Sequence, residues 1–253
     1  MARMKERTSV LQSLALMCLA VPLSAQPTAQ QAKEVDCEGT VGATRIGMTI
    51  DFKQDIITGG HYFVARDLQD IPFTSGIVSK GHIAIQMKDR STFELRFKGN
   101  GSENGQPLNF ENSAGLVGTR RGHARVEKVN LRFQSMGQYS DGQRYSAFTE
   151  LRDSEFEGII RNWRMAVLAG NRRETARYTH FPLRVNAKDG HKMIRNATQL
   201  SENWDGIFTP LYLSKIKKDV PHDMRGDNSG LVMLGHGDVW FGDKGVEVLN
   251  LPN

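Results

Sequence analysis

The segment Phe93-Glu94-Leu95-Arg96-Phe97-Lys98 alternates apolar and charged side chains residue by residue. Because successive side chains of a β-strand point to opposite faces, this period of two predicts a strand with Phe93, Leu95 and Phe97 on one buried face. The charged residues then cover the other face, as in an antiparallel sheet with one side in water.

Similar short segments surround this strand from residue 35 to residue 151. Clusters of Gly, Asn, Asp and Ser separate them, such as Gly59-Gly60 and Asp141-Gly142, and these residues favour turns. The sequence therefore predicts an all-β domain over 35–151, an antiparallel meander that forms a barrel or a sandwich. The expected strands include residues 46–52, 61–64, 82–87, 93–97, 126–133 and 145–148.

The pattern changes at Asp153. Ser154 and Glu157 have the spacing of a capping box, and apolar residues recur behind them at helical spacing until Gly170. This order of elements predicts an α+β domain over 152–253. The expected elements are a second helix from 171, strands at 181–185 and 192–194, a third helix from 196 that is broken or re-aimed at Pro210, and strands at 231–234, 239–241 and 246–251.

Three stretches of this second domain resemble the NTF2-like (SnoaL-like) superfamily. They are Phe181-Pro182-Leu183, Asn203-Trp204-Asp205-Gly206-Ile207-Phe208 and Gly235-His236-Gly237-Asp238-Val239-Trp240-Phe241. The resemblance implies a cone of curved antiparallel sheet crossed by three helices, a fold that hosts isomerases, hydrolases, binding modules and dimerisation domains. The N-terminal domain is similar to a β-rich module of exported bacterial proteins, through residues 59–63, 70–73 and 115–119.

The first 25 residues have the pattern of a cleavable signal peptide. A basic start at residues 3–7 precedes an apolar segment over 10–21, and small residues lead to Ala25. Residues 26–34 are polar and are expected to form a flexible tether. The apolar segment is shorter than the roughly 20 residues that span a bilayer, so no transmembrane helix is expected. These features predict a periplasmic or secreted protein, cleaved near Ala25.

Charge and cysteine content narrow the expected partners. The chain carries 33 Lys and Arg against 28 Asp and Glu, and the basic residues are scattered among acidic ones, so no nucleic-acid partner is expected. Signal cleavage would remove Cys18 and leave Cys37 without a disulfide partner. Because the sequence has no HExxH, CxxC or phosphate-loop motif, it predicts neither a metal nor a cofactor.

Candidate binding residues lie in the C-terminal domain. His236, Asp238 and Trp240 are predicted to alternate along one strand and to share a face. Tyr178 and Trp204, on the second and third helices, are added as further binding residues of the implied cone. The glycines on either side of His236 equally indicate a tight turn or a bulge. No catalytic residue is assigned.

These observations favour a non-catalytic periplasmic protein that binds a small apolar ligand or an envelope component. One alternative is an envelope interaction factor or inhibitor that forms a homodimer through the C-terminal domain. The other is an isomerase or hydrolase of the NTF2-like fold that uses His236 or Asp205 as its base. The sequence leaves the choice among the three open.

Overall fold

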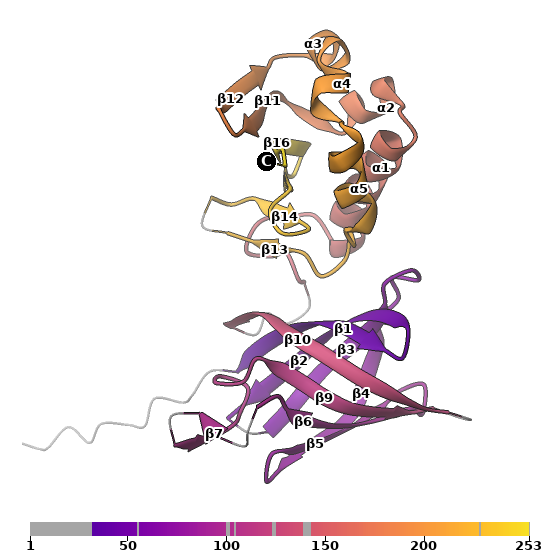
Figure 1. The fold of residues 1–253 in the computed structure, drawn as a ribbon, viewed down its shortest axis with the longest axis vertical. Coiled ribbons are helices and arrows are strands. Elements are labelled where there is room, and N and C mark those ends of the chain that lie inside the picture. The colour runs from indigo at the N-terminus through magenta and orange to yellow at the C-terminus, as the bar shows by residue number, and fades with distance from the viewer. Residues whose placement is uncertain are drawn as a thin grey trace, which may run out of the picture. The chain divides into compact units, whose positions relative to one another are not determined.

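The structure is a computed structural model, and it describes residues 32–54, 56–99, 102–103, 105–122, 125–138, 143–227 and 229–252. The predicted signal peptide and residues 26–31 of the predicted tether lie outside this part. The described residues belong to one compact unit that spans residues 31–253. Within it, a barrel and a second sheet follow each other along the chain, each with its own hydrophobic core (Figure 1).

The N-terminal half forms a closed antiparallel barrel of eight strands, which confirms the barrel alternative. The strands are β1 (Lys33–Val41), β2 (Thr44–Lys53), β3 (Ile56–Val64), β4 (Ile71–Ser79), β5 (His82–Met87), β6 (Thr92–Phe97), β9 (Gly115–Arg121) and β10 (Val126–Gln138). Each strand pairs with its neighbour in this order, and β10 pairs with β1 to close the barrel. A short hairpin of β7 (Ser102–Glu103) and β8 (Gln106–Pro107) separates β6 from β9 along the chain.

The period of two determines which side chains fill the barrel. Phe93, Leu95 and Phe97 are buried in the barrel core, as predicted, and are exposed by only 0%, 3% and 5%. Cys37 lies in the same core. An eight-stranded barrel is just wide enough to be filled by side chains, and here buried apolar side chains from seven of the strands fill it, while β4 packs only partly buried ones against them.

Two local expectations in this half need correction. Strand β1 begins at Lys33, two residues before the predicted start of the domain. The strand predicted over 145–148 is a turn, in which the amides of Phe148 and Thr149 both donate to the carbonyl of Tyr145. The Tyr145 ring is fully buried in the second core rather than in a sheet, so tertiary packing overrides its strand propensity.

The C-terminal half contains a six-stranded sheet in the order β12-β11-β16-β15-β14-β13. Its only parallel pair among the described strands is β11 with β16, which corrects the expected all-antiparallel sheet. One edge of β11 pairs with β12, its hairpin partner, so the last strand, β16, pairs with the other edge. The long connection between β11 and β16 allows the two strands to run parallel. The strands are β11 (Thr179–Ala187), β12 (Gly190–Ile194), β13 (Arg225–Gly226), β14 (Val232–Leu234), β15 (Val239–Gly242) and β16 (Gly245–Asn250).

Five helical segments lie on one side of this sheet (Figure 1), rather than the three predicted. They are α1 (Asp153–Leu168), α2 (Arg172–Arg177), α3 (Ala197–Glu202), α4 (Trp204–Ile207) and α5 (Pro210–Lys218). The predicted third helix is divided because Thr209 caps a new helix, accepting a hydrogen bond from the Tyr212 amide, with Pro210 at the first helical position. None of the described helices is long and apolar enough to cross a membrane.

The cap of α1 also differs from the prediction. Glu155 accepts a hydrogen bond from the Arg152 amide and closes the first turn, so Ser154 and Glu157 do not form the capping box. Glu157 instead points into the protein, with its side chain only 5% exposed. This places a carboxylate in the interior, beside His222 and Arg144.

Two substitutions test whether the inward side chains of the barrel strands contribute more to stability than the outward ones. Ile85→Ala should lower the free energy of unfolding by about 2–4 kcal/mol, because Ile85 is fully buried and its truncation leaves a cavity. Ile77→Ala, on the neighbouring strand, should cost less than about 0.5 kcal/mol because Ile77 is 65% exposed. Urea unfolding checks both, and equal losses would contradict the assigned inward face.

Candidate functional site

A row of polar side chains crosses the outer face of the barrel. Strand pairing places Ser135, Asp36, Thr49 and His61 next to one another on β10, β1, β2 and β3. The hydroxyl of Thr49 donates to Oδ1 of Asp36 at 2.9 Å, and that of Ser135 donates to Oδ2 at 2.5 Å. Both oxygens of this carboxylate are therefore held in place by the sheet beneath it.

The next row of the same face adds two more carboxylates. Glu34 on β1 lies directly opposite Asp51 on β2. Like charges in directly opposed positions repel each other, so this pairing costs stability unless cationic groups offset it. The barrel surface thus presents three carboxylates within two adjacent rows of its strands.

Three connecting segments bring further charges over these rows. Asp70 immediately precedes β4, Arg144 lies in the connection between β10 and α1, and Asp223 lies in the loop after α5. The Arg144 guanidinium forms ion pairs with Asp70 and, at 2.5 Å from Nε to Oδ1, with Asp223. His61 Nε2 lies 3.2 Å from Asp223 Oδ2 and 3.4 Å from Asp70 Oδ1. The loops and the barrel are joined by this group of charges.

Glu157 lies at the buried end of the same network. Its Oε1 accepts a hydrogen bond from the Tyr145 hydroxyl at 3.0 Å and lies 3.5 Å from Arg144 Nη1. Its Oε2 lies 2.8 Å from Nδ1 of His222, whose Nε2 is 2.9 Å from Asp70 Oδ1. Each ring nitrogen of His222 therefore faces a carboxylate oxygen. This arrangement connects α1 to the barrel through one imidazole.

Asp223 has an unusual backbone and an altered pKa. Its φ of 49° lies in the left-handed region, which Asp adopts more readily than most residues. Burial raises the pKa of Asp223, but the hydrogen bond and charge of His61, with Arg144 and His222, outweigh burial, so the pKa is lowered. The carboxylate is therefore held ionised in a poorly hydrated place.

These residues line a cleft of about 340 Å³. Six carboxylates face it, against one arginine and one histidine, although the whole chain has a net charge of +5. Oδ2 of Asp153 accepts a hydrogen bond from the Arg144 amide, whereas its buried Oδ1 has no hydrogen-bond partner among the described residues. The lining comprises Glu34, Asp36, Thr49, Asp51, His61, Asp70, Gln143, Arg144, Asp153, Asp223 and Met224. We call it the acidic cleft.

A smaller cavity of about 100 Å³ shares some of this wall and contains Asp219. Burial and then the nearby Asp238 carboxylate raise the pKa of Asp219 to about 6, although His236 and two arginines act in the opposite direction. The backbone of Gly235 approaches this carboxylate so closely that an added Cβ would lie 2.7 Å from it. Asp219 is thus a half-buried carboxyl group that can change its charge in mildly acidic solution.

The predicted binding residues His236, Asp238 and Trp240 do not share one strand, and none of them lines the acidic cleft. His236 and Asp238 lie in a turn over 235–238, and β15 begins only at Val239, so the predicted shared strand is wrong. The cause is the pair of flanking glycines, whose φ values of 68° and 89° reverse the chain. Asp238 pairs with Lys215 at 3.1 Å, and the Trp240 indole donates to the Gly237 carbonyl.

The two helical candidates are held by other contacts. Trp204 is only 6% exposed, and its ring centroid lies 4.4 Å from that of Phe208 in the second core. Tyr178 ends α2, and its hydroxyl accepts a hydrogen bond from Asn162. That these residues bind a ligand stays a prediction.

The acidic cleft was not predicted from the sequence. Asp36, Thr49 and His61 occupy the outward positions of strands whose inward neighbours are apolar, a signal that alternation could have revealed. Arg144 and Asp223 lie in loops with no periodic pattern. In the part of the chain that the structure describes, no three His, Cys, Asp or Glu residues are arranged to hold a metal ion. No family model matches this chain, and neither a curated protein nor a solved structure does.

The buried network predicts a large effect for one isosteric change. Glu157→Gln should lower the free energy of unfolding by about 2–4 kcal/mol, because His222 and Arg144 lose a buried anionic partner. Asp205→Asn is the control, since the Asp205 side chain is 91% exposed, and it should cost less than about 0.5 kcal/mol. Urea unfolding at neutral pH measures both. A loss for Glu157→Gln no larger than the control would show that the network adds no stability.

The raised pKa of Asp219 predicts that the protein loses stability as the pH rises. Its pKa rises from 3.8 to about 6 on folding, so the folded state binds more protons in that range and stability falls as pH rises through it. Asp219→Asn should remove this dependence and be more stable than the parent at pH 8, by ~1 kcal/mol after allowance for solvent screening. Urea unfolding at pH 4.5 and pH 8 measures the difference. An Asp219→Asn protein whose stability relative to the parent is the same at both pH values would contradict the raised pKa.

Proposed function

We propose that this chain is an exported binding protein that takes a small organic cation, an amine or a guanidinium compound, in the acidic cleft. The observation that carries the proposal is that six carboxylates line a cleft of about 340 Å³ together with only one arginine and one histidine, while Arg225 pairs with Asp36 at 3.7 Å. This volume lies within the range of small-molecule sites. The charge of the cleft is local, because the chain as a whole is basic.

The fixed position of the carboxylates supports binding. Two hydroxyls hold Asp36, and Arg144 together with His61 holds Asp70 and Asp223. Groups that are already oriented lose little freedom when a ligand binds, so more of the interaction energy contributes to affinity.

The proposed ligand differs in chemistry from the ligand that the sequence predicts. An apolar ligand or an envelope component was expected in the C-terminal cone, whereas the acidic cleft favours a charged and hydrated ligand. Export to the periplasm or beyond, and the NTF2-like character of the C-terminal half, remain part of the proposal. The signal-peptide pattern and the order of elements support these two parts, respectively.

The isomerase alternative receives less support from the geometry. A general base is usually activated by burial beside a second titratable group. The Asp205 side chain is 91% exposed, and His236 is exposed in its turn. The homodimer alternative stays a prediction.

Calorimetric titration with 1,4-diaminobutane and with guanidinium chloride tests the proposal. Both cations should bind, and neutral 1,4-butanediol and urea should bind at least about tenfold more weakly, because they match the cations in size but carry no charge. Affinity for the cations should also fall as NaCl rises, since salt screens the partly exposed carboxylates.

Two variants locate the binding. Asp153→Asn and Asp51→Asn should each weaken cation binding by about five- to tenfold, because each removes one charge from the cleft. Asp205→Asn, outside the cleft, should leave the affinity unchanged. Equal binding of the neutral analogues, or unchanged affinity in both cleft variants, would overturn the proposal.

A further inference from the structure

A second groove lies in the C-terminal half, between the β11–β12 hairpin and α4, and has a volume of about 370 Å³. Its lining differs sharply from that of the acidic cleft. Apolar side chains form most of it: Val185, Ala187, Ile194, Ile207 and Leu251. We call it the hairpin groove.

The walls of the hairpin groove are firmly held. Val185, Ile194 and Ile207 belong to the second hydrophobic core and are exposed by 5% or less. The Leu251 amide donates to the Asn186 carbonyl at 2.9 Å, which fixes the segment after β16 against the hairpin. The groove is therefore shaped before any ligand arrives.

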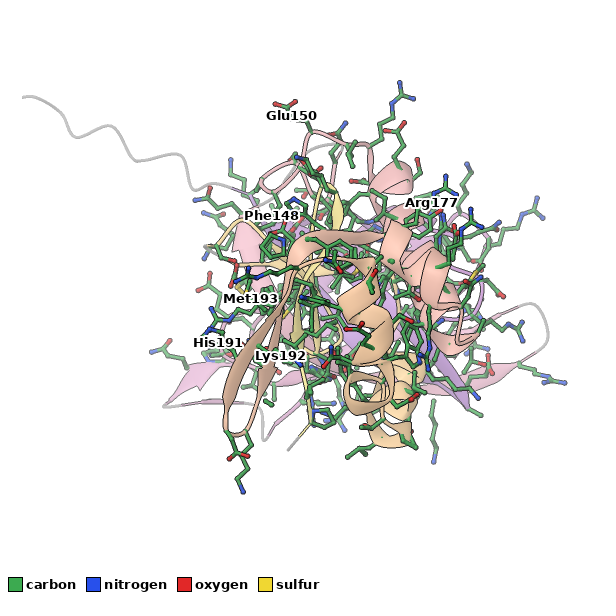
Figure 2. All side chains as sticks on the ribbon, turned by 90° about the horizontal axis from the view of Figure 1, so that it is seen from above. Phe148, Glu150, Arg177, His191, Lys192 and Met193 are labelled. Atoms are coloured by element: carbon green, nitrogen blue, oxygen red, sulfur yellow. The ribbon has the colours of Figure 1, made fainter. Side chains whose placement is uncertain are left out.

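Basic side chains stand at the edge of this apolar surface. His191 and Lys192 are both exposed on β12 and line the groove, and Figure 2 shows them on the hairpin. The Lys192 ammonium donates to Oδ1 of Asn203, the residue before α4, and so reaches from one wall of the groove to the other. Asp189, near the turn of the hairpin, is the acidic residue of the lining.

The charge of Lys192 is not neutralised by its contact. Asn203 offers a neutral amide oxygen, and no carboxylate of a described residue lies within 4.0 Å of the ammonium. An anionic group at this edge would gain a charge-assisted hydrogen bond from Lys192. The apolar walls would gain free energy by covering hydrocarbon.

We propose that the hairpin groove is a second binding site, for a small amphiphile with an aliphatic body and a single carboxylate head. The body lies over the exposed Ala187 and the half-buried Leu251, with the small exposed edges of Val185 and Ile207 beneath it, and the head lies at Lys192. This chemistry is opposite in charge to that of the acidic cleft, so the two sites select different ligands. The site does not depend on the function proposed above.

Gly206 provides a way to close the groove without disturbing the fold. It lies in α4 and lines the groove, and a Cβ added to it would meet no atom within 4 Å. A larger residue therefore enters open space, and any residue with a side chain other than Pro suits a helix better than Gly. Gly206→Leu should fill part of the groove, whereas Gly206→Ala should leave most of it open.

The test uses sodium octanoate as the probe and follows the methyl NMR signals of Val185, Ile194 and Ile207. Octanoate should shift these signals in a saturable way. Gly206→Leu should weaken binding by at least about tenfold without lowering the melting temperature, and Gly206→Ala should bind nearly as the parent does. Absence of saturable shifts in the parent, or unchanged binding in Gly206→Leu, would overturn the site.

A second comparison tests the head group. Lys192→Met should weaken octanoate binding by about tenfold and leave 1-octanol binding unchanged, because only the carboxylate uses the ammonium. Lys188→Met is the matched control on the same hairpin, since Lys188 is exposed but does not line the groove. If octylamine binds the parent as tightly as octanoate does, the assignment of an anionic ligand is wrong.

Discussion

The buried carboxylate of Glu157 joins the start of α1 to the connection from β10 and to the loop after α5, the two segments whose Arg144 and His222 reach Asp70 of the barrel. Removing a carboxylate from water is costly unless hydrogen bonds and opposite charges replace the lost hydration. Here Tyr145, Arg144 and His222 supply them from two segments far apart in the sequence. Because these segments must meet at one carboxylate, the start of α1, the connection from β10 and the loop after α5 are fixed relative to one another. The position of Arg144 and of the loop over the barrel surface follows from this meeting.

The barrel contributes the other half of the cleft through the same period of two that fills its interior. Every inward apolar residue of β1 and β2 has an outward neighbour, and strand pairing aligns those neighbours into rows. Glu34 and Asp51 are opposite in this register, and neither strand can shift by one residue without turning its core residues outward. The barrel core thus holds like charges together. Departures from the most stable local choice of this kind are expected at functional sites.

The sequence predicted features that depend on local patterns and missed those that depend on distant contacts. The strand at residues 93–97, the barrel and the strands near 232–234 and 239–242 all follow from short periods. Glu157 was misassigned because its spacing from Ser154 fits a capping box, while the actual cap uses Glu155. The alternation of His236, Asp238 and Trp240 predicts a strand, whereas Gly235 and Gly237 form a turn there. The acidic cleft joins residues from 34 to 224, and nothing in the chain between them marks their meeting.

Arg144 shows what the acidic cleft can recognise. Its guanidinium already lies between Asp70 and Asp223 at the barrel surface, with Glu157 on its buried side. These carboxylates therefore surround a planar cation that belongs to the chain itself. Glu34, Asp51 and Asp153 face the same space but contribute no ion pair to this guanidinium within 4.0 Å. One covalently attached cation thus offsets the charge of the carboxylates that it contacts. The other carboxylates of the lining stand at positions that strand pairing and the start of α1 have already fixed.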